Sequence, residues 1–160
     1  MNKEHALAYR QEHIDCGEDH ISGSSGLIHT NDYESWLKKI TDSQTEAPAG
    51  QVTSSIFFAF TGGKLVGMLQ VRHKLNDFLF NANGHIGYSV APGERKKGYA
   101  TKMLRLALEK CRELGIGNVL VTCDKDNIPS AKTITKCSGV FENEFVEENG
   151  NIINRYWITV

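Results

Sequence analysis

The stretch that decides the fold is "ERKKGYATKML", residues 94–104, where three consecutive cations stand directly before a glycine. After Gly98, apolar residues recur at a spacing of three and four positions, and they are Ala100, Met103, Leu104, Ala107, Leu108, Cys111 and Leu114. That spacing places them on one face of an α-helix, and Gly115 is a residue that commonly ends one. The sequence therefore predicts a long amphipathic helix with a cationic entrance.

The start of such a helix is a potential anion site. Its first N–H groups have no partners within the helix, and they carry about half an elementary positive charge. A glycine just before the helix lets an anion approach the backbone without meeting a Cβ. Arg95, Lys96 and Lys97 add positive charge at the same point, which favours a compact polyanion such as a diphosphate. A hydrated basic turn before an ordinary helix gives the same bare pattern.

Composition limits the classes of protein that this chain can represent. It has 160 residues, of which 40% are hydrophobic and 23% are charged, and its formal net charge is −1. Such values are typical of one globular domain, which we assign to residues 1–160. They argue against a nucleic-acid-binding protein, which usually carries a basic excess. No stretch approaches the roughly 20 apolar residues of a membrane span, and the polar start predicts no secretory signal, so we expect a cytoplasmic protein.

The four cysteines, Cys16, Cys111, Cys123 and Cys137, lie far apart in the sequence. They form no C-x-x-C pair, and no histidines stand at zinc-like spacing. Cys111 and Cys123 fall at positions that face the predicted core. We expect reduced, buried thiols and no metal site.

The remaining segments predict a mixed sheet. Helices are predicted at residues 3–13 and 31–41, with Asn31 as the cap of the second. Strands at 52–60 and 65–73 flank a Gly-Gly turn, and a further strand covers 84–92. After the long helix come a strand at 118–123, a helix at 127–139 and a closing hairpin at 140–160. A strand–helix–strand unit makes two parallel strands, so the fold class is α/β with a mixed sheet. The Gly/Ser-rich loops 16–30 and 41–51 either shape a substrate pocket or are plain connections.

Several motifs of this chain resemble those of one family. The run Arg95 to Ala100 is similar to the Q/R-x-x-G-x-G/A signature of the GNAT superfamily of acetyl-CoA-dependent N-acetyltransferases. The segment from Asn127 to Ser130 resembles the N-x-x-S/A motif of the same family, and "GHIGYSV" resembles one of its strands. The resemblance covers about residues 52–160 and implies a GNAT-like acyl-CoA N-acyltransferase fold, in which helices flank a central mixed sheet.

The resemblance also implies a binding site for acetyl-CoA as co-substrate, with no metal. The backbone of Ser89 and Val90 would hold the pantetheine arm, and the Val90 N–H would face the thioester oxygen, where it would stabilise developing negative charge. Asn127 and Ser130 would touch the arm from the opposite side, although both residues also suit a helix cap. The diphosphate would be held by Arg95, Lys96, Gly98, Tyr99, Ala100 and Thr101, with Lys97 near another phosphate.

Catalysis requires a neutral amine, and freeing a lysine-like amine of its proton at pH 7 costs roughly 4.6 kcal/mol. His85 is the first candidate for the base, because it occupies the place of a glutamate in the family's strand and its ordinary pKa is near neutrality. A structural histidine is the alternative. Tyr88 is the second catalytic candidate, but it projects from the opposite face of a regular strand, unless a bulge intervenes.

The chain departs from the family pattern in three places. Ile134 occupies a position where many members have a tyrosine that protonates the departing thiolate, so the general acid is unassigned and water is an option. Ser138-Gly139 replaces a single glycine. The fold normally opens with a strand, yet Lys3–His13 predicts a helix, so either that strand is absent or the gene starts upstream.

The predicted function is transfer of an acetyl group from acetyl-CoA to a primary amine of a small molecule or peptide, by direct attack in a ternary complex. A non-catalytic acyl-CoA-binding sensor or assembly subunit is the alternative, and a homodimer is possible. We expect no nucleic-acid or membrane partner. Arg72 and His73, which end a strand, either bind a carboxylate or are hydrated, and hydration is favoured. The acidic run 142–148 is interpreted as a solvated surface.

Overall fold

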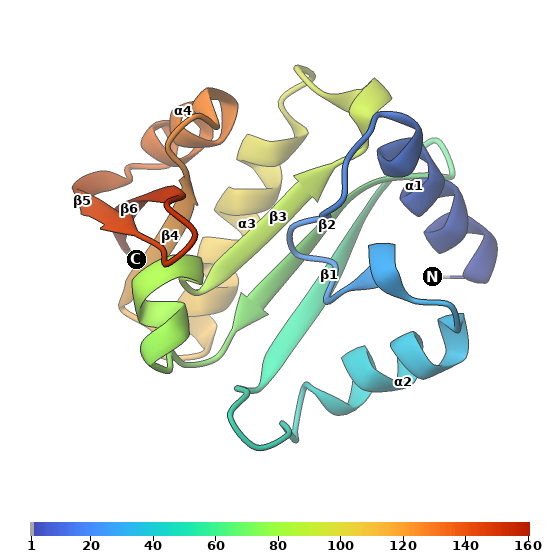
Figure 1. Ribbon diagram of the computed structural model, residues 1–160, viewed down its shortest axis with the longest axis horizontal. Helices are drawn as coiled ribbons and strands as arrows, with labels where there is room; N and C mark the ends of the chain where they lie inside the picture. Colours follow the sequence, from blue (N-terminus) through green and yellow to red (C-terminus); the bar gives the residue numbers. More distant parts are fainter. Residues whose placement is uncertain (1) are drawn as a thin grey trace.

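The computed structural model describes residues 2–160, and its central feature is a sheet of six strands (Figure 1). The strands are β1 (Ser54–Thr61), β2 (Lys64–Arg72), β3 (Ile86–Val90), β4 (Asn118–Asp124), β5 (Val140–Val146) and β6 (Ile152–Thr159). They lie in the order β1-β2-β3-β4-β6-β5, and only β3 and β4 pair in parallel. This arrangement confirms the predicted mixed α/β fold class.

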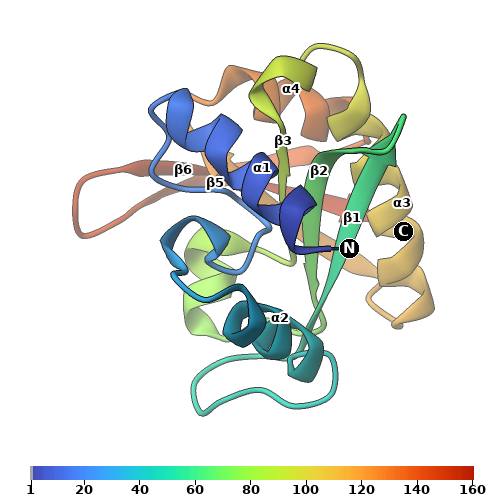
Figure 2. The same cartoon turned by 90° about the vertical axis from the view of Figure 1, so that its right-hand side faces the viewer.

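Helices cover both faces of the sheet. The α-helices in the part of the chain that the structure describes are α1 (Lys3–Asp15), α2 (Tyr33–Asp42), α3 (Tyr99–Glu113) and α4 (Ile128–Lys136). Seen edge-on in Figure 2, α1 and α2 lie on one side of the sheet and α3 lies on the other. In this view the one-turn π-helix η2 (Leu79–Asn83) lies on the side of α1 and α2. The loops that precede β1 therefore share a face with η2.

Two apolar cores hold these layers together. Side chains alternate between the faces of a strand, so Met68 of β2 packs with α1 and α2, whereas its neighbour Leu69 packs with α3. Leu104 and Cys111 of α3 are fully buried in the second core, which confirms the face predicted from their spacing. Cys123 and Cys137 are buried free thiols in the same core, and Cys16 is exposed.

The boundaries of some predicted elements need correction. Asp32, not Asn31, caps α2, because its carboxylate accepts the Glu34 N–H at 3.0 Å. The strand predicted at 84–92 is shorter, since Gly84 has a positive φ of 63° and Pro92 begins a separate helical turn. The π-helix η2 had no sequence prediction.

The chain described here begins with α1, and its first strand is β1. Gly115 follows α3 with a positive φ of 75°, as its predicted place after the helix requires. Across residues 2–160, no helix combines the length and the apolar character that crossing a membrane needs. The assignment of residues 1–160 to one domain stays a prediction.

Candidate active site

The parallel strands β3 and β4 separate soon after they meet. Ile86 opposite Val121 is their one paired position within residues 2–160. The Ala91 N–H donates to the Val66 carbonyl at 2.9 Å, so Ala91 faces β2. Backbone groups alternate in direction along a strand, and the N–H of Val90 therefore faces β4. Beyond Ile86, the backbone of Tyr88 and Val90 thus lines an opening between two strands.

The cationic loop lies at the end of β3 that adjoins this opening. Gly98 precedes α3 with φ 84°, and a Cβ added to it would meet no atom within 4 Å. The first bond of the helix runs from the Lys102 N–H to the Gly98 carbonyl, at 3.1 Å. Within residues 2–160, no side chain caps the N–H groups of the first turn, which belong to Tyr99, Ala100 and Thr101. Open space, free donors and the positive end of a helix fit a diphosphate.

The backbone of the loop is strained at one lysine. Lys96 has a φ of 65°, a left-handed conformation that costs a residue with a Cβ about 1–3 kcal/mol. Lys96 is exposed, and Lys97 forms an ion pair of 2.7 Å with Glu94. The predicted cations therefore do gather before α3, and of the two lysines only Lys97 has an internal anionic partner in the described chain.

Arg95 connects this loop to the α1–α2 segment. Its Nε donates to the Val90 carbonyl at 3.2 Å, and its Nη2 lies 2.7 Å from a Glu18 oxygen. The other Glu18 oxygen is 2.6 Å from Nδ1 of His13, a fully buried side chain. Burial raises and the bonds to His13 and Arg95 lower the pKa of Glu18, with a net shift below its ordinary value. Glu18 therefore acts as the counter-ion of Arg95 in this structure.

Tyr9 of α1 contacts strand β3 through its hydroxyl group. Its hydroxyl donates to the Ser89 Oγ at 3.0 Å, and its side chain is 1% exposed. Burial raises the pKa of Tyr9 far above its ordinary value, so the phenol stays protonated and acts as a donor. Sequence reasoning missed Tyr9, His13 and Glu18. The available signal was the spacing of Ala6, Tyr9 and His13, which is that of a buried helical stripe.

Tyr88 faces the other side of the sheet. Its hydroxyl lies 2.8 Å from the Ser130 Oγ in α4, and burial raises the pKa of Tyr88 to about 12. Ser130 is placed by Asn127, whose side chain accepts the Ser130 N–H at 3.1 Å and so caps α4. The capping role that the sequence predicted for Asn127 is confirmed, and Tyr88 joins β3 to α4.

His85 stands immediately before β3 and is 7% exposed. Its Nδ1 accepts the Leu120 N–H at 3.0 Å, so the neutral ring carries its proton on Nε2. Burial, aided by the positive charge of Arg72, lowers the pKa of His85 to about 4. The ring is therefore neutral at pH 7, as a base must be, but its unprotonated nitrogen already has a partner.

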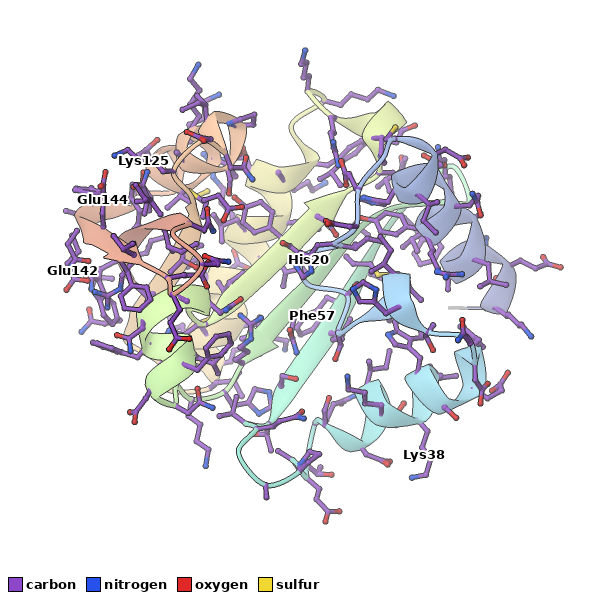
Figure 3. The ribbon with its side chains drawn as sticks, viewed as in Figure 1. His20, Lys38, Phe57, Lys125, Glu142 and Glu144 are labelled. Carbon is purple, nitrogen blue, oxygen red and sulfur yellow. The ribbon has the colours of Figure 1, made fainter. Side chains whose placement is uncertain are left out.

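The remaining candidate residues have clear positions. Ile134 is fully buried in the core between α3, α4 and the sheet, where it has no proton to give. Glu142 and Glu144 form ion pairs with Arg155 and Lys125 at 2.9 and 2.8 Å, and both carboxylates stay exposed, so this part of the acidic run is a solvated surface as predicted (Figure 3). Hydration of Arg72 is wrong as an interpretation, because its Nη1 donates to the carbonyls of Asn83 and Gly84.

Solved structures with the same fold are numerous. RimJ of Mycobacterium smegmatis, in complex with a coenzyme A disulfide, is 20% identical with a TM-score of 0.71, over 100% of this chain and 79% of that one. RimL, a ribosomal-protein alpha-N-acetyltransferase bound to coenzyme A, is 18% identical with a TM-score of 0.70, over 100% and 91%. A variant of the Vibrio cholerae spermidine N-acetyltransferase SpeG is 15% identical with a TM-score of 0.67, over 99% and 92%.

At these identities, the structural likeness establishes the fold alone. No curated protein sequence matches the chain significantly. The model of the acetyltransferase (GNAT) family matches residues 25–139, which is more than half of the chain and includes the cationic loop and α3. The protein therefore belongs to the GNAT family of acetyl-CoA-dependent N-acetyltransferases, as the motifs in its sequence predicted.

Proposed function

We propose that this protein transfers the acetyl group of acetyl-CoA to a primary amine of a small molecule or peptide, by direct attack in a ternary complex. The observation that carries the proposal is the opening between β3 and β4, which leads to an uncapped helix start. The opening suits an extended arm and the helix start suits a diphosphate. Together they provide for the pantetheine arm and the diphosphate of one coenzyme.

The coenzyme would lie along the residues that the sequence singled out. Backbone groups of Val90 would bind the arm, while the backbone of Ser89, which was also a candidate, faces Met68 of β2. Asn127 and Ser130 border the other side of the arm. When bound, acetyl-CoA supplies an activated acyl thioester. The diphosphate would be held by Arg95, Lys96, Lys97, Gly98, Tyr99, Ala100 and Thr101. Because Glu18 now neutralises Arg95, a diphosphate at this site competes with Glu18 for the guanidinium.

Val90 contributes the electrostatic part of catalysis in this proposal. Its N–H faces the gap between the strands, where no β4 carbonyl accepts it. A fixed backbone donor of this kind stabilises negative charge on the thioester oxygen without reorganising during the reaction. Tyr9 supports the position, because its bond to Ser89 anchors the preceding residue.

The acceptor amine must lose a proton, and His85 is the candidate that receives it. The neutral state of the ring meets the requirement, since its pKa of about 4 lies well below pH 7. Proton uptake at Nδ1 would break the bond to the Leu120 N–H, so the role requires a change in this contact. Tyr88 is the candidate donor to the departing sulfur, because its hydroxyl is protonated at neutral pH and Ile134 offers no donor.

The activities of two structural neighbours support an amine as acceptor. SpeG is described as a spermidine N-acetyltransferase and RimL as a ribosomal-protein alpha-N-acetyltransferase. Both acceptors are amines, one small and one at a polypeptide terminus. A non-catalytic acyl-CoA sensor is the second candidate, and the buried apolar Ile134 favours it, because a tyrosine often supplies the acid at that position in the family.

A screen of primary amines with acetyl-CoA, read as release of free thiol, tests the function. His85→Gln and Tyr88→Phe serve as comparisons. We expect turnover by the natural protein and lower kcat in both variants, with coenzyme affinity kept. Unchanged kcat in a variant would remove that residue from the mechanism.

Binding is measured separately from turnover. A hundredfold excess of acetyl-CoA over Kd should raise the unfolding free energy by about 2.7 kcal/mol, which is roughly 5–10 °C in Tm for a chain of this size. Binding without turnover of any amine supports the sensor. Absence of binding contradicts both functions.

A further inference from the structure

A cavity on the α2 side of the sheet is separate from the coenzyme residues. It has a volume of about 300 Å³ and lies between the end of α2, the loop before β1, the ends of β1 and β2, and the approach to η2. Its polar lining includes Lys39, Ser43, Ser54, Gln70 and Arg72. The proposed binding of acetyl-CoA uses none of these residues.

Arg72 is a mostly buried cation without a carboxylate partner. Its Nη1 donates to the Asn83 and Gly84 carbonyls at 3.0 and 3.1 Å. Within residues 2–160, no ion pair includes Arg72, and neither Nε nor Nη2 has a hydrogen-bond acceptor. Burial lowers its pKa to about 10, because no nearby negative charge compensates the lost hydration. A buried guanidinium of this kind favours an oxyanion, which accepts two N–H bonds side by side.

Neutral polar groups and a second cation line the same cavity. Gln70 donates to the Ser54 Oγ at 2.9 Å, which orders the wall beside Arg72. The Lys39 ammonium donates only to the Ser25 carbonyl, at 3.2 Å, among the described residues. Two exposed acids, Asp42 and Glu46, also line the cavity, and Asp42 is paired with Lys38 at 2.5 Å. The guanidinium of Arg72 therefore makes the inner wall cationic, while Lys39 and the two acids lie toward the solvent.

The cavity adjoins the reaction centre without opening directly into it. Nη2 of Arg72 lies 3.6 Å from the place of a Cβ on Gly87, and Gly87 is two residues before Ser89 on the same face. Two strand residues span roughly 7 Å. Gly23 packs on Gly87 so tightly that a Cβ on Gly23 would come within 2.4 Å of the Gly87 carbonyl oxygen. The segment 21–26 therefore covers β3 between Arg72 and Ser89.

We propose that this cavity is a binding site for an oxyanion, a carboxylate or phosphate group held by Arg72 and Lys39. The group belongs either to the far end of the acceptor, which passes beside segment 21–26, or to a free small anion. Since Lys39 is bonded to Ser25, an anion here also steadies the segment that crosses β3.

Direct binding is tested first, with the whole protein and without coenzyme. Sodium succinate and sodium phosphate are titrated against sodium chloride of equal ionic strength, and Tm and calorimetric binding are recorded. We expect both oxyanions to raise Tm. Arg72→Met should weaken their binding about 10- to 100-fold, and Lys39→Met up to about fivefold, since Lys39 is more exposed. Lys125→Met is the control, because it removes one positive charge far from the cavity. Figure 3 shows Lys125 on the opposite side of the molecule from Lys38, the neighbour of Lys39 in α2. We expect this variant to bind both oxyanions as tightly as the natural protein does.

Arg72→Met also removes one bond to η2 and one to Gly84 just after it, so its fold is checked by its own Tm. If this variant does not fold, the titrations of the natural protein and of Lys39→Met still test the proposal. The proposal is overturned if neither oxyanion exceeds chloride in the natural protein. Equal weakening by Lys39→Met and Lys125→Met would overturn it as well, because the effect would then be general electrostatics.

The source of the anion is tested with matched acceptors. Acetylation of ε-aminocaproate is compared with that of its neutral amide, whose amine is identical. A KM about 10-fold lower for the carboxylate, lost in Arg72→Met, assigns the site to the acceptor. Equal KM values together with oxyanion binding assign it to a free anion. This comparison rests on the proposed function, whereas the titration does not, so failure of one is distinguishable from failure of the other.

Discussion

Gly98→Ala should preserve the fold but weaken the binding of acetyl-CoA. Its φ of 84° is costly for any residue with a Cβ, about 1–2 kcal/mol, so Gly98→Ala should lower Tm by a few degrees. No atom lies within 4 Å of the added Cβ, so no steric cost is expected without ligand. With the diphosphate at the start of α3, the methyl group displaces one or two charge-assisted bonds of roughly 1.5–3 kcal/mol each. We expect Kd for acetyl-CoA to rise at least 10-fold.

Gly115, at the other end of the same helix, is a matched control. Its φ is 75°, and a Cβ on it would also meet nothing within 4 Å. Gly115→Ala should therefore lose a similar unfolding free energy and keep the natural Kd. Urea unfolding gives the first quantity for both variants, and isothermal titration with acetyl-CoA gives the second. Equal Kd values for the two variants would refute the placement of the diphosphate at Gly98.

Three other predictions concern stability and are measured by urea unfolding. Tyr9→Phe should lower the free energy of unfolding by about 1 kcal/mol, because it removes the hydrogen bond to Ser89. An unchanged free energy of unfolding would show that this hydrogen bond does not stabilise the fold. The pKa of His85 is about 4 in the fold against an ordinary 6.5, so stability should fall as the pH decreases through this window, and the part due to His85 is about 2 kcal/mol between pH 8 and pH 5. The pKa values of His13 and His73 are lowered too and add to the total loss. His85→Gln should remove the part due to His85, while His20→Gln, at an exposed position, should not change the loss. Leu104→Ala should cost 2–5 kcal/mol at a fully buried site, and a smaller loss would contradict its place in the core.

Local patterns predicted the parts of the fold that depend on nearby residues. The spacing from Ala100 to Cys111 sets one buried face of α3, and this is where the buried Leu104 and Cys111 lie. Leu114, which the sequence placed on the same face, caps the end of the helix and is exposed. A helix cap also depends on nearby residues, but Asn31 and Asp32 are adjacent and both residue types are favourable at an N-cap. Only the structure shows that the Asp32 side chain accepts the Glu34 N–H.

Contacts between distant segments were beyond the sequence. Tyr9 and Ser89 are 80 positions apart, and the helix stripe that holds Tyr9 gives no sign of its partner. The pairing of Arg95 with Glu18 likewise depends on how the segment after α1 crosses the end of β3. The sequence predicted the cations of the site, whereas the anion that neutralises one of them emerged only from the fold.

Arg72 shows the same limit for a single side chain. A cation at the end of a strand is usually hydrated, so the sequence favoured that interpretation. The π-helix η2, which has no clear sequence signal, provides the Asn83 carbonyl that binds Arg72, and Gly84 just after it provides the second. Burial of the guanidinium is a consequence of that unexpected element.

A crystal structure with coenzyme A tests the central claim most directly. We predict that diphosphate oxygens lie within about 3.2 Å of backbone nitrogens in the first turn of α3, between Tyr99 and Thr101. We also predict that Arg95 exchanges Glu18 for a phosphate. Phosphates bound elsewhere, with the first-turn N–H groups still free and Arg95 still paired with Glu18, would contradict the account.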